Sequence, residues 1–283
     1  MTAGPAAPAG PSSAARWPRA AFAILAAATF AAFFIVQHLK VATPLINGFP
    51  APFPRSIDPL AGGVCELRTG TGARRPVSFR SMRISFYLQN RPDEVDVYVI
   101  DAAGRVVRQI GSDARMRVDV RRTFRWNGRL ADGRPAPDGV YEIRVDLIHQ
   151  HRSLVIADQS TGAPETVTVD TAVPHPAVIS VSPRLDPAGA HEPVQIRYTG
   201  AGPGVRLVRV VVYRLAGGRV RSPVAAYTTD PRRAISVWSA TVRGRPAPPG
   251  SYLIAVRVTD AACTTGSSPV SATVAPQAVV RIG

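Results

Sequence analysis

A phrase that occurs twice constrains this sequence more than any other feature. The first copy covers residues 126–141 and the second, one residue shorter, covers residues 238–252. Both contain Gly-Arg-Pro-Ala-Pro, at 133–137 and 244–248, and both precede a run of alternating apolar and polar residues. An offset of 111 residues is the length of a domain, so the phrase indicates a duplicated domain rather than a short solenoid repeat. Such an architecture argues against a single catalytic pocket.

The residues of the phrase are those that specify a fold. Each copy opens on a tryptophan that ends an expected strand and buries a large ring. Asn-Gly and Asp-Gly pairs in the first copy supply the left-handed conformations of tight turns. The prolines stiffen the segment that connects the two expected strands. A tyrosine then anchors the next strand. We expect these fold-specifying residues to be Trp126, Gly128, Gly139 and Tyr141 in the first copy, and Trp238, Gly250 and Tyr252 in the second.

Period-two alternation predicts short strands throughout the rest of the chain. The runs are 82–88, 95–99, 105–110, 141–147 and 166–170, then 194–198, 208–213, 235–238, 252–258 and 278–282. Short strands with turn residues between them are typical of β-sandwiches. The predicted fold class is all-β, with two tandem Ig-like sandwiches at residues 76–171 and 177–283. A linker with two prolines, Thr171–Pro176, separates them.

The N-terminal region has three predicted parts. Residues 1–19 are small and proline-rich, which predicts a disordered cytoplasmic tail. Residues 20–37 carry no charge, and 18 such residues suffice for a transmembrane helix. A cleaved signal peptide is the alternative, although the apolar run is long and no clear cleavage site follows. Residues 38–75 are rich in Pro and Gly, which predicts an extended lead-in.

The distribution of charge bears on location and partners. Arg16 and Arg19 precede the apolar run and Lys40 and Arg55 follow it, so orientation depends on the sandwiches, which we expect to be extracytoplasmic. The expected location is therefore the cell membrane, with a single-pass anchor and a cytoplasmic N-terminus. Residues 38–283 have a net charge of +13. This charge either attracts anionic lipid or wall polymers, or reflects an arginine-rich composition that only solvates the surface.

Two cysteines, Cys65 and Cys263, lie 198 residues apart. In an oxidising compartment such a pair is a disulfide candidate, and a bond would tie the segment before the first sandwich to a late loop of the second. Two buried free thiols are the alternative.

The first phrase and its following strand resemble the Ig-like module of flagellar hook-capping (FlgD-like) proteins. The resemblance covers Ile84 to Asp170 well and the second unit more loosely, where Trp238-Ser-Ala replaces Trp-Asn-Gly. The anchor, lead-in and two modules are also similar to the front half of some actinobacterial surface proteins, in which a catalytic domain can follow. Family members often carry a Ser-Pro-Asn-Gly-Asp-Gly loop. Its oxygen-rich core is missing from 56–59 and 182–189, so no calcium site is expected.

Candidate chemical sites are few. His149 and His151 alternate, but no third metal ligand has suitable spacing, so we interpret them as solvated histidines at a strand end. Asp93, Glu94 and Asp96 are interpreted as a charged edge that discourages aggregation. Common nucleophile, phosphate-binding and metalloprotease motifs are absent. We therefore expect no catalytic residues, metal or cofactor.

The expected function is that of a non-enzymatic, membrane-anchored spacer or protein-interaction module outside the cytoplasm. One alternative is an accessory subunit that docks a separately encoded extracellular enzyme. Another is direct binding of an anionic envelope polymer by an arginine-rich face. Partners would be the membrane and either another envelope protein or an anionic cell-surface polymer. Nucleic acid is not expected, because no basic-aromatic motif is present.

Overall fold

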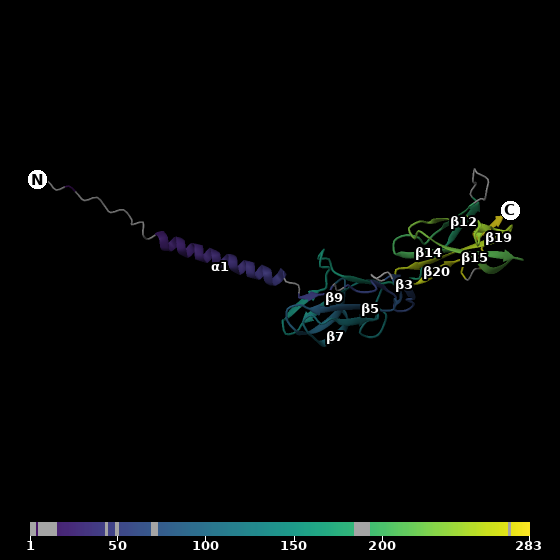
Figure 1. Ribbon diagram of the computed structural model, residues 1–283. Coiled ribbons are helices and arrows are strands. Elements are labelled where there is room, and N and C mark those ends of the chain that lie inside the picture. The colour runs from purple at the N-terminus through teal and green to yellow at the C-terminus, as the bar shows by residue number, and fades with distance from the viewer. Residues whose placement is uncertain are drawn as a thin grey trace. The chain divides into compact units, whose positions relative to one another are not determined.

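The computed structural model describes residues 4, 16–42, 45–48, 51–68, 73–183, 193–270 and 273–283 (Figure 1). Most of the predicted tail, residues 1–19, lies outside this set, as do residues 184–189 of the loop considered for calcium. The chain divides into two compact units, Met1–Asn47 and Gly48–Gly283.

The first unit contains helix α1 (Arg16–Ala42) and the short strand β1 (Ile46–Asn47). A helix over the predicted span of residues 20–37 is therefore present, as the alanine-rich sequence favours. Large apolar side chains such as Phe22, Ile24 and Phe34 are exposed along it. Within the described part of the chain, however, no helix has both the length and the apolar character needed to cross a membrane. The predicted transmembrane assignment is thus not supported.

Two sheets form the first sandwich. In one, β5 (Met82–Leu88) pairs antiparallel with β8 (Arg122–Trp126). The other has the order β2 (Ser56–Ile57), β11 (Thr166–Val169), β9 (Gly139–Leu147), β6 (Asp93–Asp101) and β7 (Val106–Met116), with β10 (Arg152–Val155) also beside β9. A separate hairpin consists of β3 (Val64–Arg68) and β4 (Arg74–Ser78).

The second sandwich repeats this plan. One sheet has the order β12 (Val178–Pro183), β13 (Val194–Tyr198) and β16 (Ile235–Trp238). The other has β15 (Arg219–Thr229), β14 (Val205–Ala216), β19 (Gly250–Asp260) and β20 (Thr265–Ser268), with β21 (Val279–Ile282) also on β19. The remaining elements are the β17 (Thr241–Val242) and β18 (Arg245–Pro246) pair and the 3₁₀ helix η3 (Pro276–Ala278).

The central strands pair in the same way in both sandwiches. β6 lies between β9 and β7 in the first, just as β14 lies between β19 and β15 in the second, while β5–β8 corresponds to β13–β16. The prediction of an all-β sandwich fold is confirmed. Each predicted strand run lies inside an observed strand, with at most one residue outside it, and several strands, such as β7 and β14, extend further than predicted.

The core of each sandwich lies between its two sheets. In the second, alternate side chains of β13 and β16 pack in one buried cluster with those of β14 and β19, including Ile196, Trp238, Val210 and Ile254. In the first, the Phe86 and Phe124 rings stack at 5.3 Å. A Cβ added at Gly111 of β7 would lie 2.6 Å from the Phe124 ring, so only glycine allows the two sheets to approach this closely there.

The repeated phrase forms the same set of contacts in both sandwiches. Trp126 Nε1 donates to the Arg129 carbonyl at 2.8 Å, and Trp238 Nε1 donates to the Thr241 carbonyl at 3.1 Å. Each indole packs on the tyrosine of the next long strand, with ring centroids 5.1 Å apart in the first pair and 5.3 Å in the second. Each tyrosine hydroxyl donates to a proline carbonyl four residues earlier, at 2.7 Å from Tyr141 and 2.6 Å from Tyr252. This is the tyrosine corner of Ig-like sandwiches.

The glycines of the phrase occupy its turns and strand starts. Gly128 has φ 69°, and the corresponding residue of the second copy, Ala240, keeps a left-handed φ of 50° although it has a side chain. A Cβ at Gly128 would also lie 3.0 Å from Pro59. Gly139 and Gly250 are the first residues of β9 and β19. The phrase therefore sets the passage from one sheet to the other in both sandwiches.

We expect Tyr141→Phe and Tyr252→Phe each to lower the free energy of unfolding by about 1 kcal/mol, the usual worth of one hydrogen bond. The ring and its packing on the indole are kept, so the loss isolates the hydroxyl contact. Urea unfolding of each variant would measure it. A loss in only one of the two variants would contradict the equivalence of the two phrases.

The segment predicted as an extended lead-in contains more structure than expected. Its residues Ser56–Ile57 form β2, which pairs parallel with β11 and buries Ile57 completely. Residues 64–68 and 74–78 form the paired strands β3 and β4. The prediction of an extended lead-in does not describe these residues. β2 pairs with a strand over 100 positions away, which no local pattern reveals. β3 and β4 pair with each other.

Candidate functional site

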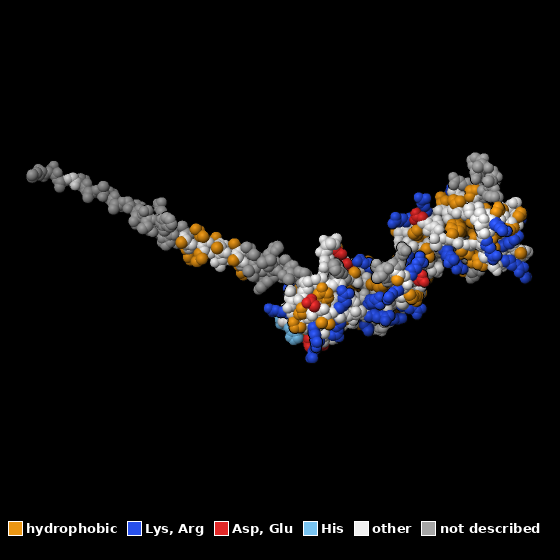
Figure 2. Space-filling model, in the orientation of Figure 1, with side chains coloured by type: hydrophobic (Ala, Val, Ile, Leu, Met, Phe, Trp, Pro, Cys, Tyr) orange, Lys and Arg blue, Asp and Glu red, His pale blue; other side chains and the backbone are white. Residues whose placement is uncertain are grey.

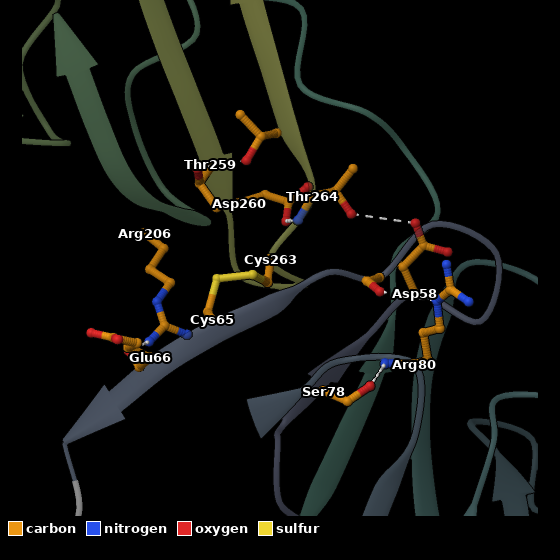
Figure 3. The surroundings of a disulfide bond; sticks show 12 residues. Asp58, Cys65, Glu66, Ser78, Arg80, Arg206, Thr259, Asp260, Cys263 and Thr264 are labelled. Atoms are coloured by element: carbon orange, nitrogen blue, oxygen red, sulfur yellow. Dashed lines mark hydrogen bonds between the residues drawn. A yellow bond between two sulfur atoms is a disulfide. The ribbon is translucent and has the colours of Figure 1, made fainter. Parts of the chain in front are cut away.

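The two sandwiches are joined by a disulfide between Cys65 of β3 and Cys263 of the turn after β19, with the Cα atoms 6.0 Å apart (Figure 3). Cys263 is buried and has a left-handed φ of 61°. The backbone approaches closely here, since a Cβ added at Gly63 would lie 2.5 Å from the Cys263 carbonyl oxygen. The junction is therefore a tight, covalent contact between segments far apart in sequence.

Polar groups from both sides fill the surroundings of the disulfide. Asp58, fully buried, accepts hydrogen bonds from the Leu60 and Ala61 amides through Oδ1. Its Oδ2 accepts one from the hydroxyl of Thr264, 206 residues further on, at 3.3 Å (Figure 3). The sequence indicates for Asp58 only that it lies in a loop with too few oxygen ligands for calcium. In the structure it holds its own turn and binds the second sandwich.

Arg206 makes a second bridge across the junction. Its Nη2 donates to the Glu66 carbonyl at 3.3 Å, and its guanidinium lies 5.3 Å from the centre of the Phe79 ring. Burial lowers the pKa of this guanidinium below its ordinary value. Beside it lies a hollow of about 560 Å³ whose lining is mostly apolar and includes Pro52, Leu67 and Val205.

Asp260, at the end of β19, is a buried carboxylate near the junction. Burial raises the pKa of its carboxyl, the Thr264 amide hydrogen bond opposes this, and the charges of Asp170 and Asp58 add to the rise. Its Oδ2 is buried without a hydrogen-bond partner. The ionised form of Asp260 is therefore destabilised in the folded protein.

This raised pKa predicts a pH dependence of stability. As pH rises above about 4, Asp260 loses its proton in the unfolded chain before it does so in the folded protein. The folded state therefore becomes less stable until the pH reaches the higher pKa that Asp260 has in the folded protein. We expect Asp260→Asn to be more stable than the wild type at pH 7, with the difference shrinking toward pH 4. Thermal unfolding of both proteins across this range tests it. A difference that stays constant with pH would contradict the assignment.

The structure also places the histidines and acidic residues that the sequence singled out. His149 and His151 lie in the turn between β9 and β10 rather than on a strand, and both side chains are exposed. His149 Nδ1 is 2.9 Å from Oδ1 of Asp93. Within the described residues, no group of three or more His, Cys, Asp or Glu side chains could hold a metal ion.

The interpretation of Asp93, Glu94 and Asp96 as a protective edge is wrong. β6 is an interior strand between β9 and β7, so these residues are not at an edge. Asp93 is buried and accepts hydrogen bonds from the backbone amides of His149 and Gln150. Burial raises its pKa, but these hydrogen bonds outweigh that effect and hold the pKa below the usual value. Asp93 thus fixes the turn that follows β9.

A second candidate site lies on the outer face of β5 and β8, where Arg83 is directly opposite Arg125. Both side chains border a cleft of about 330 Å³, together with Ser81, Thr123 and residues 76–78 of β4. Sequence alternation predicted that Arg83 points away from the core. It could not show that Arg125 is its cross-strand neighbour, because the register between β5 and β8 joins residues about 40 positions apart.

Comparison with known proteins gives a domain match and remote structural likenesses. No curated protein is significantly similar to this chain. The solved structures it resembles include PorZ of the type-IX secretion system of Porphyromonas gingivalis (20% identity, TM-score 0.24, covering 43% of this chain and 11% of that one). Another is the BSP domain of a biofilm-associated protein (14% identity, TM-score 0.24, covering 77% of this chain and 27% of that one). A third is a tetra-tandem repeat from the extending region of a large adhesion protein (15% identity, TM-score 0.24, covering 67% of this chain and 44% of that one).

This chain thus spans less than half the length of each of these three structures. The family comparison is more specific and is local to the first sandwich. Residues 75–150, which run from β4 to the turn after β9, match the FlgD Ig-like domain.

Proposed function

We propose that this chain is a non-enzymatic, extracytoplasmic protein-interaction module built from two Ig-like sandwiches that are fastened to each other. The observation that carries the proposal is the junction around Cys65–Cys263. Disulfides persist in oxidising compartments and are rare in the cytosol, which supports a location outside the cytoplasm. A junction cross-linked and hydrogen-bonded in this way would hold two interaction surfaces at a fixed spacing.

The second sandwich is, in this proposal, a divergent copy of the first, FlgD-like one, and the actinobacterial type of surface protein remains the expected setting. The shared strand order and the matching Trp–Tyr contacts support duplication. The partner would be another envelope protein that contacts exposed strand edges or loops. The tryptophan, tyrosine and glycine residues of the repeated phrase serve folding in both sandwiches. Binding would therefore use the loops and the outer faces of the sheets.

The location is tested with a reporter enzyme that is active only outside the cytoplasm, fused to the C-terminus of the full chain. Reporter activity in intact cells is the expected result. An inactive reporter that becomes active when moved behind an established export signal would overturn the extracytoplasmic assignment.

Membrane attachment through α1 is a further part of the proposal. Its support is the row of exposed apolar side chains, among them Phe22, Leu25, Phe30 and Phe34, which favour an apolar environment. The full chain is expected in the membrane fraction after carbonate extraction, and Leu25→Arg with Phe30→Arg is expected to release it. Wild-type protein found entirely in the supernatant would contradict attachment.

A further inference from the structure

The outer face of β5 and β8 carries an arrangement that folding alone does not favour. Arg83 lies directly opposite Arg125, and like charges in this position repel each other. The next pair on the same face, Ser85 and Thr123, is joined through its hydroxyl oxygens at 2.7 Å. Two guanidinium groups and two hydroxyls therefore follow each other along one exposed face.

Neutral groups hold the two arginines in place. Nε and Nη2 of Arg125 both donate to the buried Ser81 hydroxyl oxygen, at 2.9 and 2.7 Å. The Arg83 guanidinium lies 5.6 Å from the centre of the Phe53 ring. Since a guanidinium has five N–H donors, these contacts orient the charge of Arg125 and leave donors for another acceptor.

The two arginines also lack a carboxylate partner among the described residues. Other exposed arginines of the same sandwich have one: Arg105 is 2.8 Å from Asp101, and Arg134 is 2.6 Å from Asp132. Among the residues that the structure describes, no carboxylate pairs with the charge of Arg83 or Arg125, whereas that of Arg105 and Arg134 is neutralised locally.

The cleft beside these groups concentrates their field. It has a volume of about 330 Å³, and Phe53, Pro76 and Ser78 also line it. The charged residues that line the cleft are Arg83 and Arg125, so it carries one sign of charge and attracts anions. Figure 2 shows arginine side chains, in blue, gathered over the region labelled β5 and β3 in Figure 1.

We propose that this cleft is a binding site for an oxyanion, a carboxylate or phosphate group of an acidic polymer. Arg83 and Arg125 would contact the anion, and the hydroxyls of Ser85 and Thr123 would receive the neighbouring polar groups of the polymer. Paired guanidinium forks match the geometry of both oxyanions. This inference goes beyond the proposed function, because it requires neither a protein partner nor the membrane.

The test uses the purified full chain and two fluorescent polymers, polygalacturonate for carboxylate and polyphosphate for phosphate, with neutral dextran as the blank. Binding is followed by fluorescence anisotropy at several salt concentrations. We expect binding to at least one acidic polymer that weakens with salt, and none to dextran. The preferred polymer identifies the source of the anion. Binding to neither acidic polymer would overturn the proposal.

Matched variants separate the site from general charge. Arg83→Gln with Arg125→Gln is expected to weaken binding by about tenfold or more, because it removes the charged hydrogen bonds to the anion. Arg105→Gln with Arg134→Gln removes the same charge from arginines that already have carboxylate partners, and is expected to change affinity by less than about twofold. Equal losses in both double variants would show nonspecific attraction and overturn the site.

A second variant covers the case in which the cleft variant fails to fold. Arg83→Lys with Arg125→Lys keeps the charge but not the planar fork of guanidinium donors, and it is expected to bind several-fold more weakly. Unchanged affinity of this variant would overturn the proposal.

Discussion

Trp126→Ala is expected to lower the free energy of unfolding of the first sandwich by about 3–5 kcal/mol, the usual cost of deleting a buried tryptophan ring. The side chain is only 1% exposed, its ring packs on Tyr141, and its Nε1 binds the Arg129 carbonyl. The substitution therefore removes core packing and also leaves a carbonyl without its donor. It acts at the point where β8 passes into the turns of the repeated phrase.

Denaturant unfolding followed by circular dichroism measures this loss, and two variants control it. Trp126→Phe keeps an aromatic ring and should cost clearly less than Trp126→Ala. Trp238→Ala should lower the free energy of unfolding of the second sandwich by a similar amount, because its indole contacts the equivalent residues Tyr252 and Thr241. A loss below about 1 kcal/mol for Trp126→Ala would mean that the phrase does not hold the sandwich together.

Replacing both cysteines by serine is expected to lower stability by about 5 kcal/mol in the chain-entropy model, because the bond closes a loop of 198 residues. Without the disulfide the unfolded chain gains conformational entropy. The gain is large because Cys65 precedes nearly all of the first sandwich and Cys263 follows most of the second. The contacts of Asp58 with Thr264 and of Arg206 with Glu66 remain and would hold the junction only weakly.

Guanidinium unfolding of the wild type, with and without a reducing agent, provides the comparison. Reduction should lower the wild-type midpoint to that of the Cys65→Ser, Cys263→Ser variant and should leave the variant unchanged. A wild type that does not respond to reduction would show that the link contributes nothing to stability.

The sandwich fold could be predicted from the sequence because its signals are local. In β5, for instance, burial alternates residue by residue, so the apolar positions of Met82–Leu88 mark the strand directly. The repeated phrase marks the crossing between sheets in the same way, since its glycines, prolines and tyrosine act within a few residues of one another. β15 has no such pattern, because most of its residues are exposed or half-buried, and it was not predicted.

The candidate sites depend on contacts that no local pattern encodes. Asp58 and Thr264 are 206 residues apart, and nothing near either residue indicates the other. The pairing of Arg83 with Arg125 requires the register of two strands that are not consecutive in the chain. The cysteines are the exception, because two such residues in an otherwise cysteine-free chain suggest each other as partners even at a distance.

The fastening of the two sandwiches is tested most directly by mapping the thiols of protein isolated from the cell envelope without reduction. Trypsin should release residues 56–68, which contain Cys65, and residues 258–281, which contain Cys263. The structure predicts that mass spectrometry finds these two peptides as one cross-linked species that separates on reduction. Finding both peptides separately, with alkylated free thiols, would contradict the account.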